Sequence, residues 1–147
     1  MKKYIAEMLG TMVLVLMGCG TAVSLSCTSA NPDLASTVVG TALAFGLSVV
    51  AYAIGGISGC HINPAITLGC LLSGRISGKD AGMYMLFQVI GAFIGSAILW
   101  VLTSNSGLVG TGANACQEGV SVIGALLAEI VFTFVFVAML LFGGFIL

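Results

Sequence analysis

Long apolar runs separated by short polar segments dominate the hydropathy pattern of this chain. The runs cover residues 4–26, 38–54, 81–103 and 120–147. About 20 apolar residues are enough to carry a helix across the hydrocarbon core of a bilayer. The pattern therefore predicts spanning helices over the first three runs and a further one that begins near residue 120.

The chain between the second and third spans is unusual because it holds no Asp, Glu, Lys or Arg from Thr37 to Gly74. As one helix it would extend roughly 57 Å at about 1.5 Å per residue, too long for one crossing and too short for two with a turn. A span over 38–54 followed by a half-length helix over 64–73 fits better. A helix that short cannot cross, so it either re-enters the membrane or lies in the interface.

The basic residues favour re-entrance. Lys2, Lys3, Arg75 and Lys79 are the only Lys and Arg residues. If the N-terminus is cytoplasmic and 64–73 does not cross, all of them lie on the cytoplasmic side, as the positive-inside rule requires. We therefore expect an integral protein of the plasma (inner) membrane with a cytoplasmic N-terminus.

An internal repeat divides the chain into two units. Ala6-Glu7-x-x-x-Thr11 near the start matches Ala128-Glu129-x-x-x-Thr133 in the last apolar run. Because an acidic residue inside a span is costly, two in the same local context indicate a repeat. The first unit, 1–119, would hold three spans, and an odd number inverts the second unit. Residues 120–147 would be the first span of that unit, which we expect to stop early.

Composition excludes several classes of protein. The chain is 59% hydrophobic and 6% charged with a mean hydropathy of +1.21, which argues against a soluble domain, and its net charge of −1 argues against nucleic-acid binding. The sequence predicts no cofactor, no metal site and no enzyme, since the lone histidine lacks a plausible triad. The cysteines are scattered and are expected to act as small packing residues: Cys19, Cys27, Cys60, Cys70 and Cys116.

The stretch GGISGCHINPAITLG, residues 55–69, carries polar and helix-breaking residues within the uncharged segment. Asn is a leading N-cap residue and Pro is favoured at the first helical position, so Asn63-Pro64 predicts the start of the half-length helix. Non-helical backbone at membrane depth survives only where it is buried in protein or lines water. The helix would also direct the positive end of its dipole inward, disfavouring cations and protons there.

SGCHINPAITLG resembles the first signature loop of the aquaporin and glycerol-facilitator family, the major intrinsic proteins, with the pattern SGxHxNPAxTxG. The Ala-Glu-x-x-x-Thr repeat, LAFGLSV and FQVIGAFIG are also similar to this family, closer to its bacterial water channels. The resemblance covers essentially the whole chain but only the first half to two-thirds of a family member. It implies an all-α transmembrane fold, with a first repeat of three spans plus a re-entrant half-helix and the first helix of an inverted second repeat.

The resemblance further implies a passive pore for water or small neutral solutes, in a subunit that forms a homotetramer in the lipid bilayer. Backbone carbonyls would accept hydrogen bonds from permeants in single file, and the Asn63 amide would donate to them at mid-membrane. These carbonyls would be those of Gly59, Cys60, His61 and Ile62, and Pro64 and Ala65 would be structural support for the loop. His61 would be a structural, path-lining residue, which overlaps with a satisfied core histidine.

Further residues take supporting roles in the family. Glu7 and Glu129 would be buried acceptors that tie the two signature loops, and Gln88 would bond either loop backbone or another helix. Gly91-x-x-x-Gly95 predicts close helix packing.

The chain also departs from the family pattern. The constriction aromatic would be Phe45, although two missing residues before His61 rotate the helix by about 200° and could bring Leu43 to the path instead. The second signature loop and its arginine are absent. A water channel, a glycerol-like facilitator and a non-conducting membrane fragment therefore all stay open.

Overall fold

The computed structural model describes residues 1–24, 35–105, 110–113, 116 and 119–143, and it is helical throughout its regular elements. The elements are α1 (Lys2–Ser24), a π-helical turn η1 (Ala35–Val39), α3 (Gly40–Ser58), α4 (Pro64–Leu72), α5 (Gly78–Ser104) and α6 (Val122–Phe142). Within these described ranges no strand occurs. The all-α prediction is confirmed, while Cys27 lies outside the described residues.

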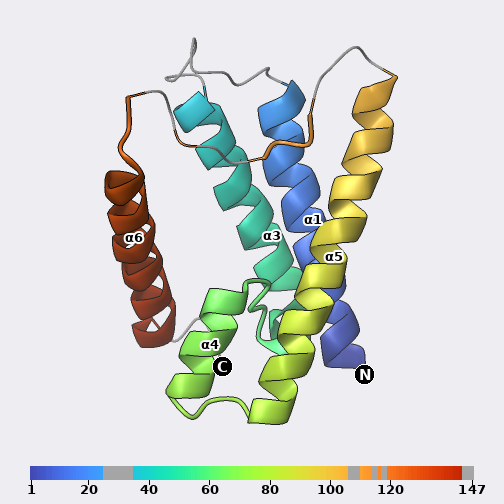
Figure 1. Ribbon diagram of the computed structural model, residues 1–147. Helices are drawn as coiled ribbons and strands as arrows, with labels where there is room; N and C mark the ends of the chain where they lie inside the picture. Colours follow the sequence, from blue (N-terminus) through green and yellow to red (C-terminus); the bar gives the residue numbers. More distant parts are fainter. Residues whose placement is uncertain (25–34, 106–109, 114–115, 117–118, 144–147) are drawn as a thin grey trace.

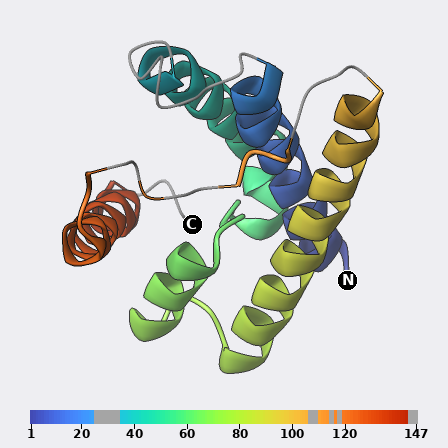
Figure 2. The ribbon, with the colours of Figure 1, turned by 45° about the horizontal axis from the view of Figure 1, so that its top comes forward.

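Helices α1, α3, α5 and α6, with η1 continuing α3, are long and apolar enough to cross a membrane. Figure 1 shows α1, α3 and α5 lying side by side, while α6 lies next to α4. Figure 2 shows that the axis of α6 stands apart from that of α3. Helix α1 is the centre of the packing, since it contacts both α3 and α5, whereas α6 contacts α4.

Small residues let α1 and α5 approach closely. A Cβ atom added to Gly91 would lie 2.1 Å from the carbonyl oxygen of Met8, and one added to Gly95 would lie 2.9 Å from that of Met12. Real Cβ atoms do not come this near to backbone oxygen, so only glycine fits at these two positions. The predicted Gly-x-x-x-Gly packing face is confirmed.

The second spanning helix is longer than predicted. The sequence indicates an end near residue 54, but α3 continues to Ser58 and is capped by Gly59 in the left-handed region at φ 84°. The N–H of Gly59 bonds the carbonyl of Gly55, 2.9 Å away, which satisfies the end of the helix. Adjacent Gly55 and Gly56 suggest a linker, yet they only reduce helix propensity and do not remove a backbone donor. The connection to α4 is consequently shorter, residues 59–63.

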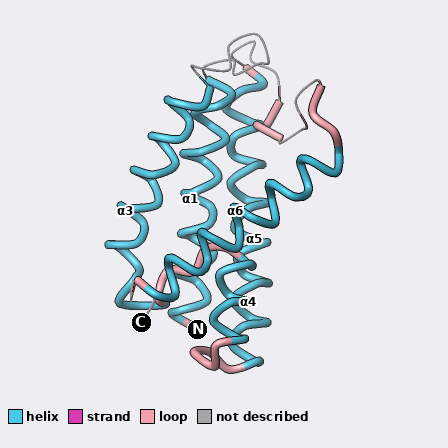
Figure 3. Tube along the Cα trace, turned by 90° about the vertical axis from the view of Figure 1, so that its left-hand side faces the viewer, coloured by secondary structure: helices cyan, strands magenta, loops and turns pink. Residues whose placement is uncertain are grey.

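Helix α4 lies alongside α5 in the lower half of the bundle (Figure 1), and the N-terminal end of α4 lies near the middle of the long helices. Figure 3 shows the same arrangement from the side, with the chain turning back from the end of α3 before α4 begins. Ile66, Thr67 and Cys70 of α4 are buried. The exposed positions of the helix are apolar, namely Pro64, Leu68 and Leu72. A helix lying in the interface would carry polar residues on its water-facing side, so this apolar face favours the re-entrant alternative.

Candidate functional site

The loop between α3 and α4 has an unusual backbone. Cys60 and Ile62 adopt positive φ angles of 53° and 43°, directly after Gly59. Non-glycine residues rarely occupy this left-handed region, and such strain persists only where the surroundings enforce it. The enforcing contacts come from α1, α4 and α5.

Glu7 of α1 holds the loop through its carboxylate. The side chain is fully buried, at 0% exposure. Its Oε1 accepts from the His61 N–H at 2.9 Å and the Ser58 hydroxyl at 2.6 Å. Its Oε2 accepts from the Ile62 N–H at 2.6 Å and Gln88 Nε2 at 2.7 Å. These four contacts fill the acceptor positions of an ionised carboxylate, so a buried charge that would otherwise be costly is compensated.

The same contacts orient the loop carbonyls. In a planar trans peptide the C=O points opposite to the N–H. Because the His61 and Ile62 N–H groups point at Glu7, the carbonyls of Cys60 and His61 point away from it. No donor among the described residues bonds either of these two oxygens. They therefore remain available as hydrogen-bond acceptors.

The two flanking carbonyls of the loop differ from each other. The N–H of Cys60 bonds the Ser58 hydroxyl at 3.1 Å, so the Gly59 carbonyl in that peptide points away from Ser58. The Ile62 carbonyl instead faces the Thr11 hydroxyl of α1, at a long 3.4 Å. Among the loop carbonyls, that of Ile62 is therefore the one that already has a protein hydrogen-bond donor nearby.

His61 belongs to a second group of buried side chains. The residue is 4% exposed and its Nδ1 lies 3.1 Å from Thr67 Oγ1 of α4. Gln88 Nε2 of α5 lies 3.0 Å from that same hydroxyl. Tyr84 packs edge-on against the His61 ring, with the two ring centres 5.0 Å apart, and donates to the Ser58 carbonyl at 2.8 Å. Gln88 therefore bonds side chains on two other helices, Glu7 of α1 and Thr67 of α4, which is the interhelical alternative, and it does not bond the loop backbone.

Asn63 starts α4 as the sequence predicts. Its Oδ1 accepts from the Ala65 N–H at 2.8 Å, and Pro64 occupies the first turn. Since this bond uses the amide oxygen, Nδ2 is the part of the side chain left to donate elsewhere. The N-terminus of α4, with its positive dipole end, meets the loop at this point.

The family model of the major intrinsic proteins matches residues 1–143. The chain belongs to the major intrinsic protein family. With the four long apolar helices, membership makes it an integral membrane protein.

Its relatives include bacterial proteins named Aquaporin Z. The one from Rhodopseudomonas palustris is 41% identical over 144 residues, covering 91% of this chain and 59% of the relative. Those from Brucella melitensis and Bradyrhizobium diazoefficiens are 41% and 40% identical, covering 96% and 92% of this chain and 64% and 60% of the relatives. The chain thus spans about three fifths of the length of these curated relatives.

The two alternative residues on α3, aliphatic Leu43 and aromatic Phe45, lie on different sides of the helix. Leu43 packs on α1, since a Cβ atom added to Gly18 would lie 2.3 Å from Leu43 Cδ2. Phe45 lies about 200° around the helix from Leu43. Phe45 is 67% exposed, as expected for a position on the other side of α3 from Leu43.

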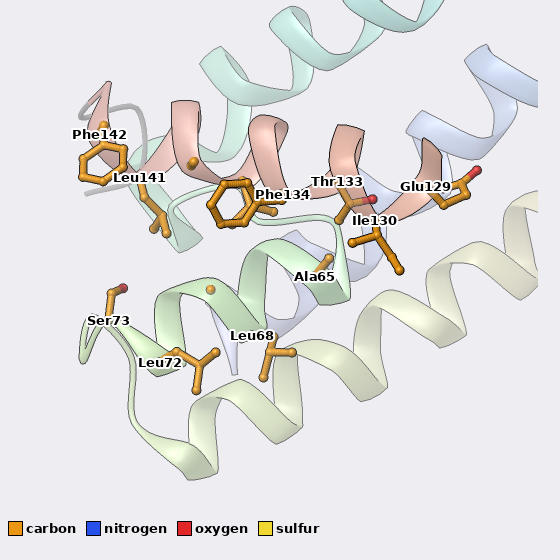
Figure 4. Close-up of a pocket in the computed structure, with 13 residues that line it drawn as sticks. Ala65, Leu68, Leu72, Ser73, Glu129, Ile130, Thr133, Phe134, Leu141 and Phe142 are labelled. Atoms are coloured by element: carbon orange, nitrogen blue, oxygen red, sulfur yellow. The ribbon is translucent and has the colours of Figure 1, made fainter. Parts of the chain in front are cut away.

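Glu129 is placed differently from its counterpart in the first repeat, and the expectation that it is buried is wrong for this structure. It is exposed on α6, and no hydrogen bond joins it to any described residue. The physical reason is that no loop packs over this part of α6 in the described chain, whereas Glu7 has the loop and α5 around it. Glu129 lies with Ile130 and Thr133 beside an apolar groove of about 820 Å³ between α4 and α6 (Figure 4).

Sequence reasoning missed four residues of this site: Ser58, Thr67, Tyr84 and Thr11. Each had a signal in the sequence. Thr11 follows Glu7 by one helical turn and Tyr84 precedes Gln88 by one turn, so each pair shares a helix face. Ser58 and Thr67 lie within the signature stretch itself.

Proposed function

We propose that the chain is a subunit of a passive water channel of the aquaporin type. The observation that carries this proposal is the strained loop before α4, whose N–H groups are bonded to a buried Glu7 while the carbonyls of Cys60 and His61 stay free. A run of fixed acceptors suits a permeant that must give up its hydration shell in a narrow path. The names of the relatives, Aquaporin Z, support water as the permeant.

In this proposal the path passes the loop and the start of α4. The carbonyls of Gly59, Cys60 and His61 accept hydrogen bonds from single-file water, with a lesser part for that of Ile62. Asn63 Nδ2 donates to the water oxygen, because Oδ1 is held by the cap. The positive dipole end of α4 lies at the same point and opposes the passage of protons.

Phe45 is the proposed constriction residue on α3. Leu43, the alternative, is engaged on Gly18 of α1, which supports Phe45. A bulky aromatic at a constriction favours water over larger solutes such as glycerol. The glycerol-like facilitator is therefore the less favoured alternative within the family.

We further propose the finer features of organisation. Residues 1–119 form the first repeat, and residues 120–147 begin an inverted second repeat. The N-terminus lies on the cytoplasmic side of the inner membrane. Lys2 and Lys3 begin α1 and Arg75 and Lys79 flank the start of α5, and these two helix starts lie at the same end of the bundle (Figure 1), which supports this orientation. The chain assembles as a homotetramer, a proposal that rests on the family resemblance alone. Its role is transport rather than catalysis.

A non-conducting membrane protein is the competing function. The open apolar groove between α4 and α6 favours it, since a water path needs a continuous protein wall. Osmotic swelling of proteoliposomes that hold residues 1–147 distinguishes the two. Water flux well above that of empty liposomes, reduced by Asn63→Asp at equal protein incorporation, supports the channel. Flux at the lipid background would refute conduction by this chain.

A further inference from the structure

Gln88 sets the direction of hydrogen bonding in the buried group around His61. Its Nε2 lies 2.7 Å from Glu7 Oε2 and 3.0 Å from Thr67 Oγ1, so both of its N–H bonds are used. Turning the amide over would bring Gln88 Oε1 against a carboxylate oxygen, which is acceptor against acceptor. The amide keeps its orientation although its Oε1 is then buried without a partner among the described residues. Thr67 must therefore accept from Gln88.

The remaining contacts of the Thr67 hydroxyl decide where its single proton goes. Thr67 Oγ1 lies 3.2 Å from the Asn63 carbonyl oxygen and 3.1 Å from His61 Nδ1. A hydroxyl has one proton and two lone pairs, and a carbonyl oxygen can only accept. All three contacts are hydrogen bonds only if the proton points to Asn63 and the lone pairs accept from Gln88 and from His61.

We infer that Gln88 and Thr67 act as positioning residues that hold neutral His61 in its Nδ1–H tautomer, leaving the Nε2 lone pair as an acceptor. The opposite tautomer would need Thr67 to donate to Nδ1 and would leave its contact with the Asn63 carbonyl without a proton. The neighbouring Tyr84 hydroxyl does not compete for the ring, because it donates to the Ser58 carbonyl.

The tautomer decides what His61 offers to a permeant. An Nε2 lone pair extends the set of loop acceptors, so that Asn63 remains the donor of the signature stretch. A ring with Nε2–H would instead present a second donor next to Asn63. This consequence rests on the proposed channel function, whereas the tautomer itself depends only on the buried contacts.

The test uses ¹⁵N nuclear magnetic resonance of the full chain in lipid bilayers, labelled at histidine. His61 is the only histidine in the chain, so each ring nitrogen gives an unambiguous signal. At about pH 8, well above the usual histidine pKa, the ring is expected to be neutral. The expected spectrum shows a protonated Nδ1 and an unprotonated Nε2. A protonated Nε2 in the wild-type chain would overturn the inference. Because this measurement uses the wild-type chain, it does not depend on whether a variant folds.

Variants then assign the effect to Thr67. Thr67→Val removes the hydroxyl at nearly constant shape and should produce a mixture of tautomers, while Thr67→Ser should restore the wild-type signals. Thr21→Val is the matched control, because the Thr21 hydroxyl donates to Met17 within its own helix. An unchanged Nδ1–H signal in Thr67→Val would refute the role of Thr67. Because no flux is measured, these outcomes are independent of whether the chain conducts water.

Discussion

Replacing Glu7 by Gln tests whether one buried carboxylate organises the loop. The substitution keeps the shape of the side chain but turns one of its two oxygens into a donor. Each oxygen accepts from one backbone N–H and one side chain: Oε1 from His61 and Ser58, Oε2 from Ile62 and Gln88. Whichever oxygen is replaced, a backbone donor of the loop then faces another donor.

The magnitude follows from how many partners can adapt. The Ser58 hydroxyl can rotate and the Gln88 amide can turn over, so the side-chain partner on the altered end can present an oxygen instead. The backbone N–H of His61 or Ile62 cannot adapt. One buried unpaired N–H costs about 1–3 kcal/mol, and the remaining bonds lose their charge-assisted strength. The gain from no longer burying a charge opposes this, so we expect a net loss of roughly 1–3 kcal/mol.

The assay is the free energy of unfolding in mixed micelles, measured from helix circular dichroism as the fraction of denaturing detergent rises. Glu129→Gln is the matched control because it makes the same change in the same repeat context, but at an exposed side chain. The control should change the free energy of unfolding by no more than about 0.5 kcal/mol. Water permeability of liposomes should fall for Glu7→Gln and not for the control.

Two results would refute this reasoning. If Glu7→Gln leaves the free energy of unfolding unchanged or raises it, the cost of burying the charge outweighs its hydrogen bonds. If the two variants lose the same free energy of unfolding, the loss does not come from the loop contacts around Glu7.

Two further substitutions or modifications address packing and the path. Gly91→Ala should cost about 1–3 kcal/mol of unfolding free energy because its Cβ would meet the Met8 carbonyl oxygen at 2.1 Å, whereas Gly82→Ala, with nothing within 4 Å, should be neutral or stabilising. Equal effects of the two changes would contradict the close α1–α5 contact. A small membrane-permeant thiol reagent should modify the half-buried Cys60 faster than Cys70, which is 0% exposed, and lower water flux in proportion. Full modification of Cys60 with unchanged flux would remove that residue from the path wall.

Features set by local chemistry could be predicted from the sequence. Asn63-Pro64 predicts the start of α4, because an N-cap oxygen and a residue without an N–H suit the first turn of any helix. The spacing of Gly91 and Gly95 predicts a close helix contact because both lie on one face. The end of α3 differs from the prediction, since Gly55 and Gly56 weaken a helix without ending it, and the termination depends on the conformation of Gly59.

The sequence by itself determined the helical class, the number and approximate extent of the apolar runs, and the half-length helix, because each depends on hydropathy and spacing along the chain. Only the tertiary structure decided which of two similar glutamates is buried. Glu7 and Glu129 share their local context, but the loop and α5 surround only Glu7 in the described chain. It also decided that Leu43 packs on α1, and that Thr67 joins His61 to Gln88. The physical reason is the same in each case: burial and hydrogen-bond direction depend on which elements meet in space, and that information is not local in the sequence.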